Sequence, residues 1–216
     1  MDEKEVLKIF KAEKAYLSGH FLLSSGLHSP NYVQCALLLQ KPLIAETLCR
    51  ALAGKLSGIK VDVVIGPALG GILVAYEMAR ALSAKGGSTF GGRPEAGPPP
   101  AEKVRAIFAE RVEGKFTLRR GFDLKKNERA LVVEDVITTG KSSREVIDLV
   151  GQIGAKTIAV ASLVDRSGEE GGLSLFSQEF YALLKINIQT YKPEGCPLCR
   201  QAALPLTKPG SRGLST

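Results

Sequence analysis

Short apolar runs recur along the chain, and stretches with the spacing of an amphipathic helix separate them. A run of four to eight such residues is typical of a strand covered on both faces. The predicted core strands are residues 61–66, 104–109, 130–133, 157–164 and 182–188. Because helical stretches lie between them, the pattern predicts an α/β fold with an open, mostly parallel sheet and right-handed crossovers.

The N-terminal region carries separate local signals. Asp2 and Glu5 have the spacing of a capping box, and the apolar positions that follow predict a helix over residues 3–16. Two short strands are expected on either side of a turn at Gly26. Pro42 suits the first turn of the next helix, because its missing N–H would have no partner there.

Two stretches depart from this periodic pattern. Residues 85–103 are rich in glycine and proline and have no apolar face, which predicts a flexible surface insertion. The sheet pattern resumes after them, so we expect a single domain over residues 1–216. Residues 193–216 contain further proline and glycine and predict an irregular tail.

The formal net charge of the 216-residue chain is +7. A basic balance suits nucleic acid, but it equally suits an enzyme whose substrates carry several phosphates. No nucleic-acid-binding motif is recognisable, so neither nucleic acid nor a membrane is an expected partner. No apolar run approaches the roughly 20 residues that span a bilayer, and the first residues do not resemble a secretory signal, so a cytoplasmic location is the default expectation.

Four cysteines are too few for a disulfide framework in a chain of this length. Cys35 and Cys49 have apolar neighbours and are expected in the core. Cys196 and Cys199 have the spacing of half a zinc knuckle, but no second pair of ligands lies near them in the sequence. The two histidines, His20 and His28, are far away along the chain, so a complete zinc site is not predicted.

The strongest chemical signal follows the strand at residues 130–133. Glu134 and Asp135 come at its carboxyl end, where open α/β sheets place their ligands. Residues 138–143 then supply hydroxyls and a glycine before a helix expected over residues 144–152. Such a loop suits a phosphate, and the acids suit ribose hydroxyls. The spacing excludes a P-loop, and the alternative is an ordinary turn with exposed acids.

Two further segments extend this hypothesis. Residues 66–71 form a second strand–glycine-loop–helix unit, which suggests a ligand with two anionic ends. Residues 110–122 predict a hairpin or mobile loop that is rich in cations. Without other context, a solvated polar hairpin explains that second segment equally well.

Several stretches together resemble the bacterial-type orotate phosphoribosyltransferases. The segment Glu134 to Ser142 is similar to the phosphoribosyl-pyrophosphate (PRPP) signature of the type I phosphoribosyltransferases. The segment from Phe21 to Tyr32, with its Ser-Gly-x-x-Ser-Pro-x-Tyr element, favours the orotate branch. Further similar stretches are residues 66–71, 105–111 and 118–122.

The resemblance implies the type I fold, with a small N-terminal hood over residues 1–40. It implies transfer of phosphoribose from PRPP to orotate by a homodimer, with Mg²⁺ brought by PRPP and no metal ligand from the protein. The implied catalytic residues are Lys115, Arg111 and Asp135. The implied PRPP-binding residues are Glu134, Asp135, Val136, Ile137, Thr138, Thr139, Gly140, Lys141, Ser142, Leu69 and Gly70, and the implied orotate-binding residues are Thr138, Arg166, Tyr32 and Val33.

The chain departs from many relatives at three points. Its cationic loop lacks their histidine, and Ser24 and Gly70 stand where many have lysine. These changes leave open which loop cation acts, with Lys115 favoured and Arg111, Arg119 and Arg120 as further candidates. Three other functions stay open: a purine phosphoribosyltransferase, a PRPP-sensing regulator, and a structural role for the cysteine-containing tail.

Overall fold

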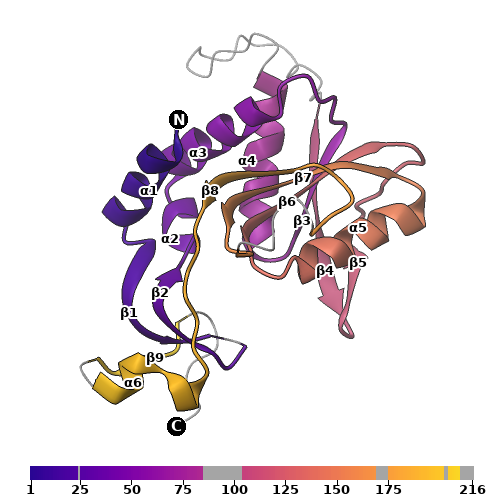
Figure 1. Ribbon diagram of the computed structural model, residues 1–216. Coiled ribbons are helices and arrows are strands. Elements are labelled where there is room, and N and C mark those ends of the chain that lie inside the picture. The colour runs from indigo at the N-terminus through magenta and orange to yellow at the C-terminus, as the bar shows by residue number, and fades with distance from the viewer. Residues whose placement is uncertain (24, 85–103, 169–174, 202–203, 210–216) are drawn as a thin grey trace.

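A six-stranded sheet forms the centre of the computed structural model, which describes residues 1–23, 25–84, 104–168, 175–201 and 204–209 (Figure 1). Its strand order is β5-β4-β3-β6-β7-β8, and all neighbours are parallel except β4 and β5. The strands are β3 (Val63–Pro67), β4 (Arg105–Val112), β5 (Lys115–Leu118), β6 (Arg129–Ile137), β7 (Lys156–Asp165) and β8 (Phe180–Lys185). The predicted α/β fold is therefore confirmed.

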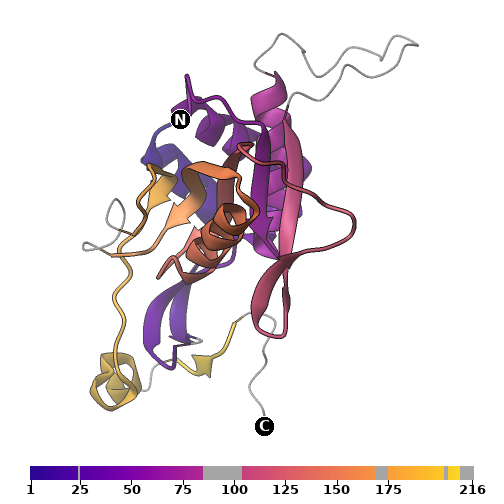
Figure 2. The same ribbon diagram turned by 90° about the vertical axis from the view of Figure 1, so that its right-hand side faces the viewer.

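Helices cover both faces of this sheet (Figures 1 and 2). Val64 packs on the side of α1 (Glu3–Ala12), α3 (Pro42–Lys55) and α4 (Gly70–Ala84), with the short α2 (Ala36–Leu39). Val63 and Ile65 face α5 (Lys141–Ile153) on the other side. Because successive side chains of a strand point to opposite faces, a strand buried on both faces has to be apolar at every position.

The strand order reverses between β3 and β6. The chain leaves β3 through α4 and continues to β4 on one side, whereas it leaves β6 through α5 and continues to β7 on the other. The two helices lie on opposite faces, so the loops after the two strands diverge. Ligands of open α/β sheets bind in the crevice at such a point.

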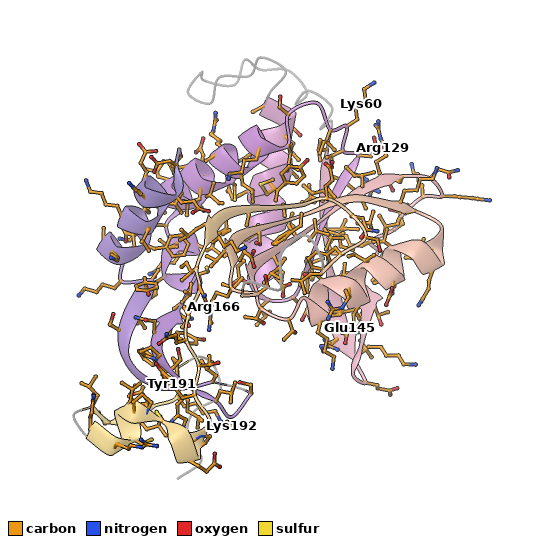
Figure 3. All side chains as sticks on the ribbon, in the orientation of Figure 1. Lys60, Arg129, Glu145, Arg166, Tyr191 and Lys192 are labelled. Carbon is orange, nitrogen blue, oxygen red and sulfur yellow. The ribbon has the colours of Figure 1, made fainter. Side chains whose placement is uncertain are left out.

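An ion pair joins the same two strands at their opposite ends. The Asp62 carboxylate accepts hydrogen bonds from Nε of Arg129 at 2.8 Å and from its main-chain N–H at 2.9 Å. These hydrogen bonds hold the pKa of Asp62 at about 2, below its usual range. Arg129 and the neighbouring Lys60 lie at the edge of the sheet farthest from Arg166 (Figure 3).

The N-terminal helix is shorter than predicted. Its capping box is present, because Asp2 and Glu5 each accept a hydrogen bond from the other's main-chain N–H. The helix ends at Ala12, however, and Lys14 adopts a left-handed conformation with φ of 54°. The chain then enters β1 (Tyr16–Leu22), since pairing with β2 (His28–Val33) overrides the helical spacing of its apolar residues. The turn at Gly26 and the helix opened by Pro42 are confirmed.

The C-terminal tail is more regular than predicted. It contains the 3₁₀ turn η2 (Pro193–Gly195), α6 (Pro197–Gln201) and the short strand β9 (Leu206–Thr207). Strand β9 pairs in parallel with β1, so the tail completes a three-stranded sheet of order β2-β1-β9. From here on, the hood means this three-stranded sheet together with α6, and not residues 1–40. It lies apart from the central sheet at one end of the molecule (Figures 1 and 2).

The predicted insertion at residues 85–103 and the residue Ser24 lie outside the described residues. None of the helices in the described segments is both long and apolar enough to cross a membrane.

Candidate functional site

Two consecutive acids near the end of β6 point to opposite faces of the sheet. Glu134 lies on the α5 side, where Ser143 Oγ donates a hydrogen bond to its carboxylate. Asp135 lies on the α4 side, so close to Gly70 that a Cβ on this glycine would be 2.5 Å from the carboxylate. Strand β6 continues to Ile137, so the acids belong to the strand and do not follow it as predicted. They therefore lie on the two faces of the sheet at the point where the strand order reverses.

Burial changes the acidity of both carboxyl groups. Desolvation raises the pKa of Glu134 to about 7, against the hydrogen bond from Ser143 that lowers it, while the charge of Asp135 raises it further. Burial also raises the pKa of Asp135, and main-chain N–H groups of residues 135 and 136 oppose this shift. A poorly solvated carboxylate gains from new hydrogen-bond donors, so the pair is suited to accept hydroxyl groups of a ligand.

The loop after β6 has features that suit an anion. Gly140 is the residue before α5 and has a φ of 67°, which an L-residue rarely adopts. Gly140 has no side chain to cap this helix, and within the described residues Thr139 Oγ1 accepts a hydrogen bond from the Lys141 main-chain N–H at 3.4 Å. The start of the helix is otherwise suited to an anion. Thr138 and Thr139 are exposed beside them. The helix begins at Lys141, three residues earlier than predicted.

The second glycine loop, which follows β3, lies next to the loop after β6 at Asp135. A Cβ on Gly66 would lie 2.3 Å from the main-chain oxygen of Gly71, so the turn after β3 closes tightly only without side chains. Leu69 is 82% exposed at its tip, and the Ala68–Leu69 peptide is cis. The contact between Gly70 and Asp135 places this loop beside the β6 loop, as a single ligand with two anionic ends requires.

Arg166 follows β7 at the same edge of the sheet. Its main-chain N–H donates to the Ile137 oxygen at 2.7 Å, which fixes it beside the end of β6. Its side chain is partly buried, and in the described segments its Nε has no hydrogen-bond partner. Burial lowers the pKa of Arg166, while Tyr32 and Tyr16 oppose that shift. Figure 3 shows Arg166 between the sheet and the hood. A guanidinium whose Nε has no partner is suited to a planar carboxylate.

The hood contributes residues on the side of the candidate site opposite the central sheet. Burial raises the pKa of Tyr32, Arg166 lowers it and Asp135 raises it, so the phenol is close to both charged groups. The side chains of Val33 and Ile137 are buried in the core, so either residue can offer a ligand only its main chain.

Two residues beside this edge had no predicted role in the site. Tyr16 was assigned to a helix, yet it starts β1 and influences the pKa of Arg166. Cys35, expected only in the core, is buried against Asp135, with its Sγ 3.9 Å from the Asp135 main-chain oxygen. Ser143 was predicted as part of the hydroxyl-rich loop, but its hydrogen bond to Glu134 was not.

The cationic segment forms the predicted hairpin, β4–β5, and it lies against α5. Arg111 forms a salt bridge with Glu145 and stacks over Phe116, with 4.2 Å between guanidinium carbon and ring centre. Arg120 pairs with Glu110. Lys115 is exposed at the start of β5 and has no salt bridge within the described part of the chain. The hairpin cations are thus separate from the Glu134–Asp135 pair.

Comparisons with known proteins agree with this geometry. A family model described as the phosphoribosyl transferase domain matches residues 38–174, more than half of the chain. The orotate phosphoribosyltransferase of Carboxydothermus hydrogenoformans is 53% identical over 210 residues, which cover 96% of this chain and 97% of that protein.

Solved structures share the fold. Mycobacterium tuberculosis orotate phosphoribosyltransferase in complex with PRPP has a TM-score of 0.61 at 22% identity, covering 86% of this chain and 96% of that one. Adenine phosphoribosyltransferase from Thermoanaerobacter pseudethanolicus has a TM-score of 0.60 at 16% identity, covering 83% and 99%. The fold is thus common to enzymes for different bases, and the sequence identity is what distinguishes them. The chain belongs to the phosphoribosyltransferase family and, within it, to the orotate phosphoribosyltransferases.

Proposed function

We propose that the chain transfers the 5-phosphoribosyl group from PRPP to N1 of orotate at the crevice between β3 and β6. The products are orotidine 5′-monophosphate and pyrophosphate, and the step belongs to pyrimidine biosynthesis. The observation that carries the orotate assignment is the Arg166 guanidinium, whose buried Nε has no hydrogen-bond partner among the described residues and which follows β7 at the same end of the sheet as the two acids. Orotate supplies a carboxylate for it, whereas a purine base does not.

PRPP has a complementary group for each part of this edge. The 5′-phosphate suits the loop Thr138–Ser142 and the main-chain N–H groups at the start of α5. The ribose hydroxyls suit Glu134 and Asp135, and the pyrophosphate suits the loop at Leu69 and Gly70. In this arrangement Val136 and Ile137 contribute through their main chain, between the acids and the phosphate loop.

Orotate then lies between the sheet and the hood. Arg166 binds its carboxylate, with Tyr32 and the main chain of Val33 on one side and Thr138 on the other. Since Tyr32 is close to both Arg166 and Asp135, the base stays next to the ribose.

The reaction needs positive charge on the leaving group. The bond from C1 to pyrophosphate breaks with an oxocarbenium-like centre, so negative charge grows on the pyrophosphate. Lys115 is our first candidate for neutralising it and Arg111 the second, because Glu145 already holds Arg111. A Mg²⁺ ion bound to the pyrophosphate oxygens of PRPP would supply further charge neutralisation, with no ligand from the protein.

An exposed apolar stripe supports a homodimer with shared active sites. Leu69, Leu73 and Tyr76 are 82%, 48% and 61% exposed, and their spacing places them on one side of α4 and the loop before it. A partner subunit that covers this stripe would lie next to the pyrophosphate loop. A hairpin extending from that partner could then bring its Lys115 to the site. We also infer a cytoplasmic location, where orotate and PRPP are available.

With PRPP and Mg²⁺, the purified chain is expected to consume orotate, measured as loss of its ultraviolet absorbance, and EDTA should stop the reaction. Adenine, guanine and hypoxanthine serve as the matched alternative substrates. Turnover of a purine without turnover of orotate would refute the orotate assignment and leave the PRPP site standing.

Changing Arg166 to Gln should lower kcat/KM for orotate by about 100-fold or more, because a charge-assisted contact to the carboxylate is lost. The KM for PRPP should change by less than about threefold. Arg50→Gln on the exposed side of α3 is the control for removing a cation. Equal losses for both substrates would assign Arg166 to general folding and not to the base.

Changing Lys115 to Ala should lower kcat about 10-fold or more with the fold intact, because the leaving group loses a cation. Lys125→Ala, another exposed lysine, is the control and should retain full activity.

Mixing the impaired dimers of Lys115→Ala with those of Asp135→Asn tests the sharing of sites. Activity should return on subunit exchange, because one site of each mixed dimer has both groups intact.

Unchanged turnover in the single variant Lys115→Ala would remove this lysine from the reaction.

The pH profile should report Glu134. Its charged form accepts the ribose hydroxyls, so kcat/KM for PRPP should rise with pH around an apparent pKa near 7. The Ser143 hydrogen bond lowers that pKa, so Ser143→Ala should move the rise to higher pH. Ser142→Ala, one residue earlier, serves as a comparison. An identical profile in Ser143→Ala would show that another group controls the pH dependence.

A further inference from the structure

Four side chains that are distant in the sequence converge in the hood. His20 comes from β1, His28 from β2, and Cys196 and Cys199 from the tail at α6. One ligand atom from each lies within 4.8 Å of all the others. The sequence analysis judged the histidines too far away to complete a site, and the tertiary structure overturns that judgement.

The distances match a tetrahedral metal site. His20 Nε2 lies 2.9 Å from His28 Nδ1 and 3.7 Å from both Sγ atoms, and Cys199 Sγ lies 3.3 Å from His28 Nδ1. Typical zinc–nitrogen and zinc–sulfur bond lengths place tetrahedral ligands about 3.3 to 3.8 Å apart. These four distances lie within about 0.4 Å of that range, and the remaining pairs of ligand atoms lie within 4.8 Å of one another.

Hydrogen bonds alone explain the cluster poorly. His20 Nε2 faces three polar atoms, although one ring nitrogen can donate or accept only a single strong hydrogen bond. His20, His28 and Cys196 are buried, so water does not readily supply the missing partners. A disulfide between the two cysteines would still leave both imidazoles unexplained.

The surroundings orient the ligands. His20 Nδ1 is 3.4 Å from the main-chain oxygen of Leu204, a contact that favours a proton on Nδ1 and leaves the Nε2 lone pair for a metal. Cys199 is one helical turn after Cys196, so both thiols face the same side. His28 is also held by main-chain hydrogen bonds in both directions with Tyr191, just before the tail turn.

We propose that these four residues bind a structural Zn²⁺ ion. Two imidazoles and two thiolates fill a tetrahedral shell, so no position remains for a substrate or a reactive water. The ion would fasten the tail to the β1–β2 hairpin, where Tyr191 and Lys192 lead into α6 (Figure 3). The same hairpin carries Tyr32, so the ion would brace one wall of the site without taking part in the reaction.

The test begins with metal content. The chain, purified without a histidine tag and under a phosphine reductant, should contain about one zinc per chain by mass spectrometry. Cys199→Ser should reduce this more than about tenfold. This variant is chosen because Cys199 is exposed, so its folding is less at risk than that of a Cys196 variant. Cys49→Ala removes a buried thiol outside the cluster and should keep the zinc.

Two further readouts are independent of catalysis. Replacement of zinc by Co²⁺ should give the visible absorption of a tetrahedral thiolate site, and Cys199→Ser should abolish it. A strong chelator should lower the Tm of the original chain and of Cys49→Ala, but not that of Cys199→Ser, because metal binding is coupled to folding.

Three results would overturn the proposal. The first is a reduced, folded chain that contains no zinc and gives no Co²⁺ spectrum after metal is added. The second is equal zinc content in Cys199→Ser and the original chain. The third is a disulfide between the two cysteines whose reduction does not restore metal binding. Loss of orotate turnover would not bear on this proposal, since none of these measurements uses activity.

Discussion

The alternation of side chains along β6 is the constraint on which the site depends. Both faces of this strand are covered by helices, so its consecutive acids have to lie on opposite sides of the sheet. Glu134 therefore meets the start of α5, and Asp135 meets the start of α4. One strand end thus links the two loops at the point where the strand order reverses. Gly70 has to lack a side chain because Asp135 already occupies that space.

Burial gives this pair its chemical character. Ionised carboxyl groups are poorly solvated at a partly covered sheet edge, and the pKa of Glu134 rises to about 7 as a result. Arg166 is at the same end of the sheet, and Tyr32 is close enough to both Arg166 and Asp135 for their charges to shift its pKa. The edge therefore holds acceptors for hydroxyls and a donor for a carboxylate, with a phenol near both. This is the pattern of charge that a ribose next to an acidic base requires.

The hood depends on contacts between the two ends of the chain. Its sheet contains β1 and β2 from the N-terminal region and β9 from the tail, and a two-stranded hairpin alone would be only marginally stable. Ser29 is held from the tail side too, since its hydroxyl lies 3.5 Å from the Gln189 main-chain oxygen. The proposed metal site would add to these contacts at the far end of the hairpin. The hairpin that carries Tyr32 thus contacts residues from the far end of the chain.

The sequence alone determined the parallel sheet and the two glycine loops, and it predicted the residues of the phosphate site. Those features rest on local signals: continuous apolar runs, a glycine where the chain turns, and acids at a strand end. It failed where contacts between distant segments decided the outcome. Pairing with β2 ended the first helix at Ala12, pairing with β1 ordered the tail, and the hood brought His20 and His28 to the cysteines. Local patterns cannot show such contacts, because their energy comes from residues that are far apart in the chain.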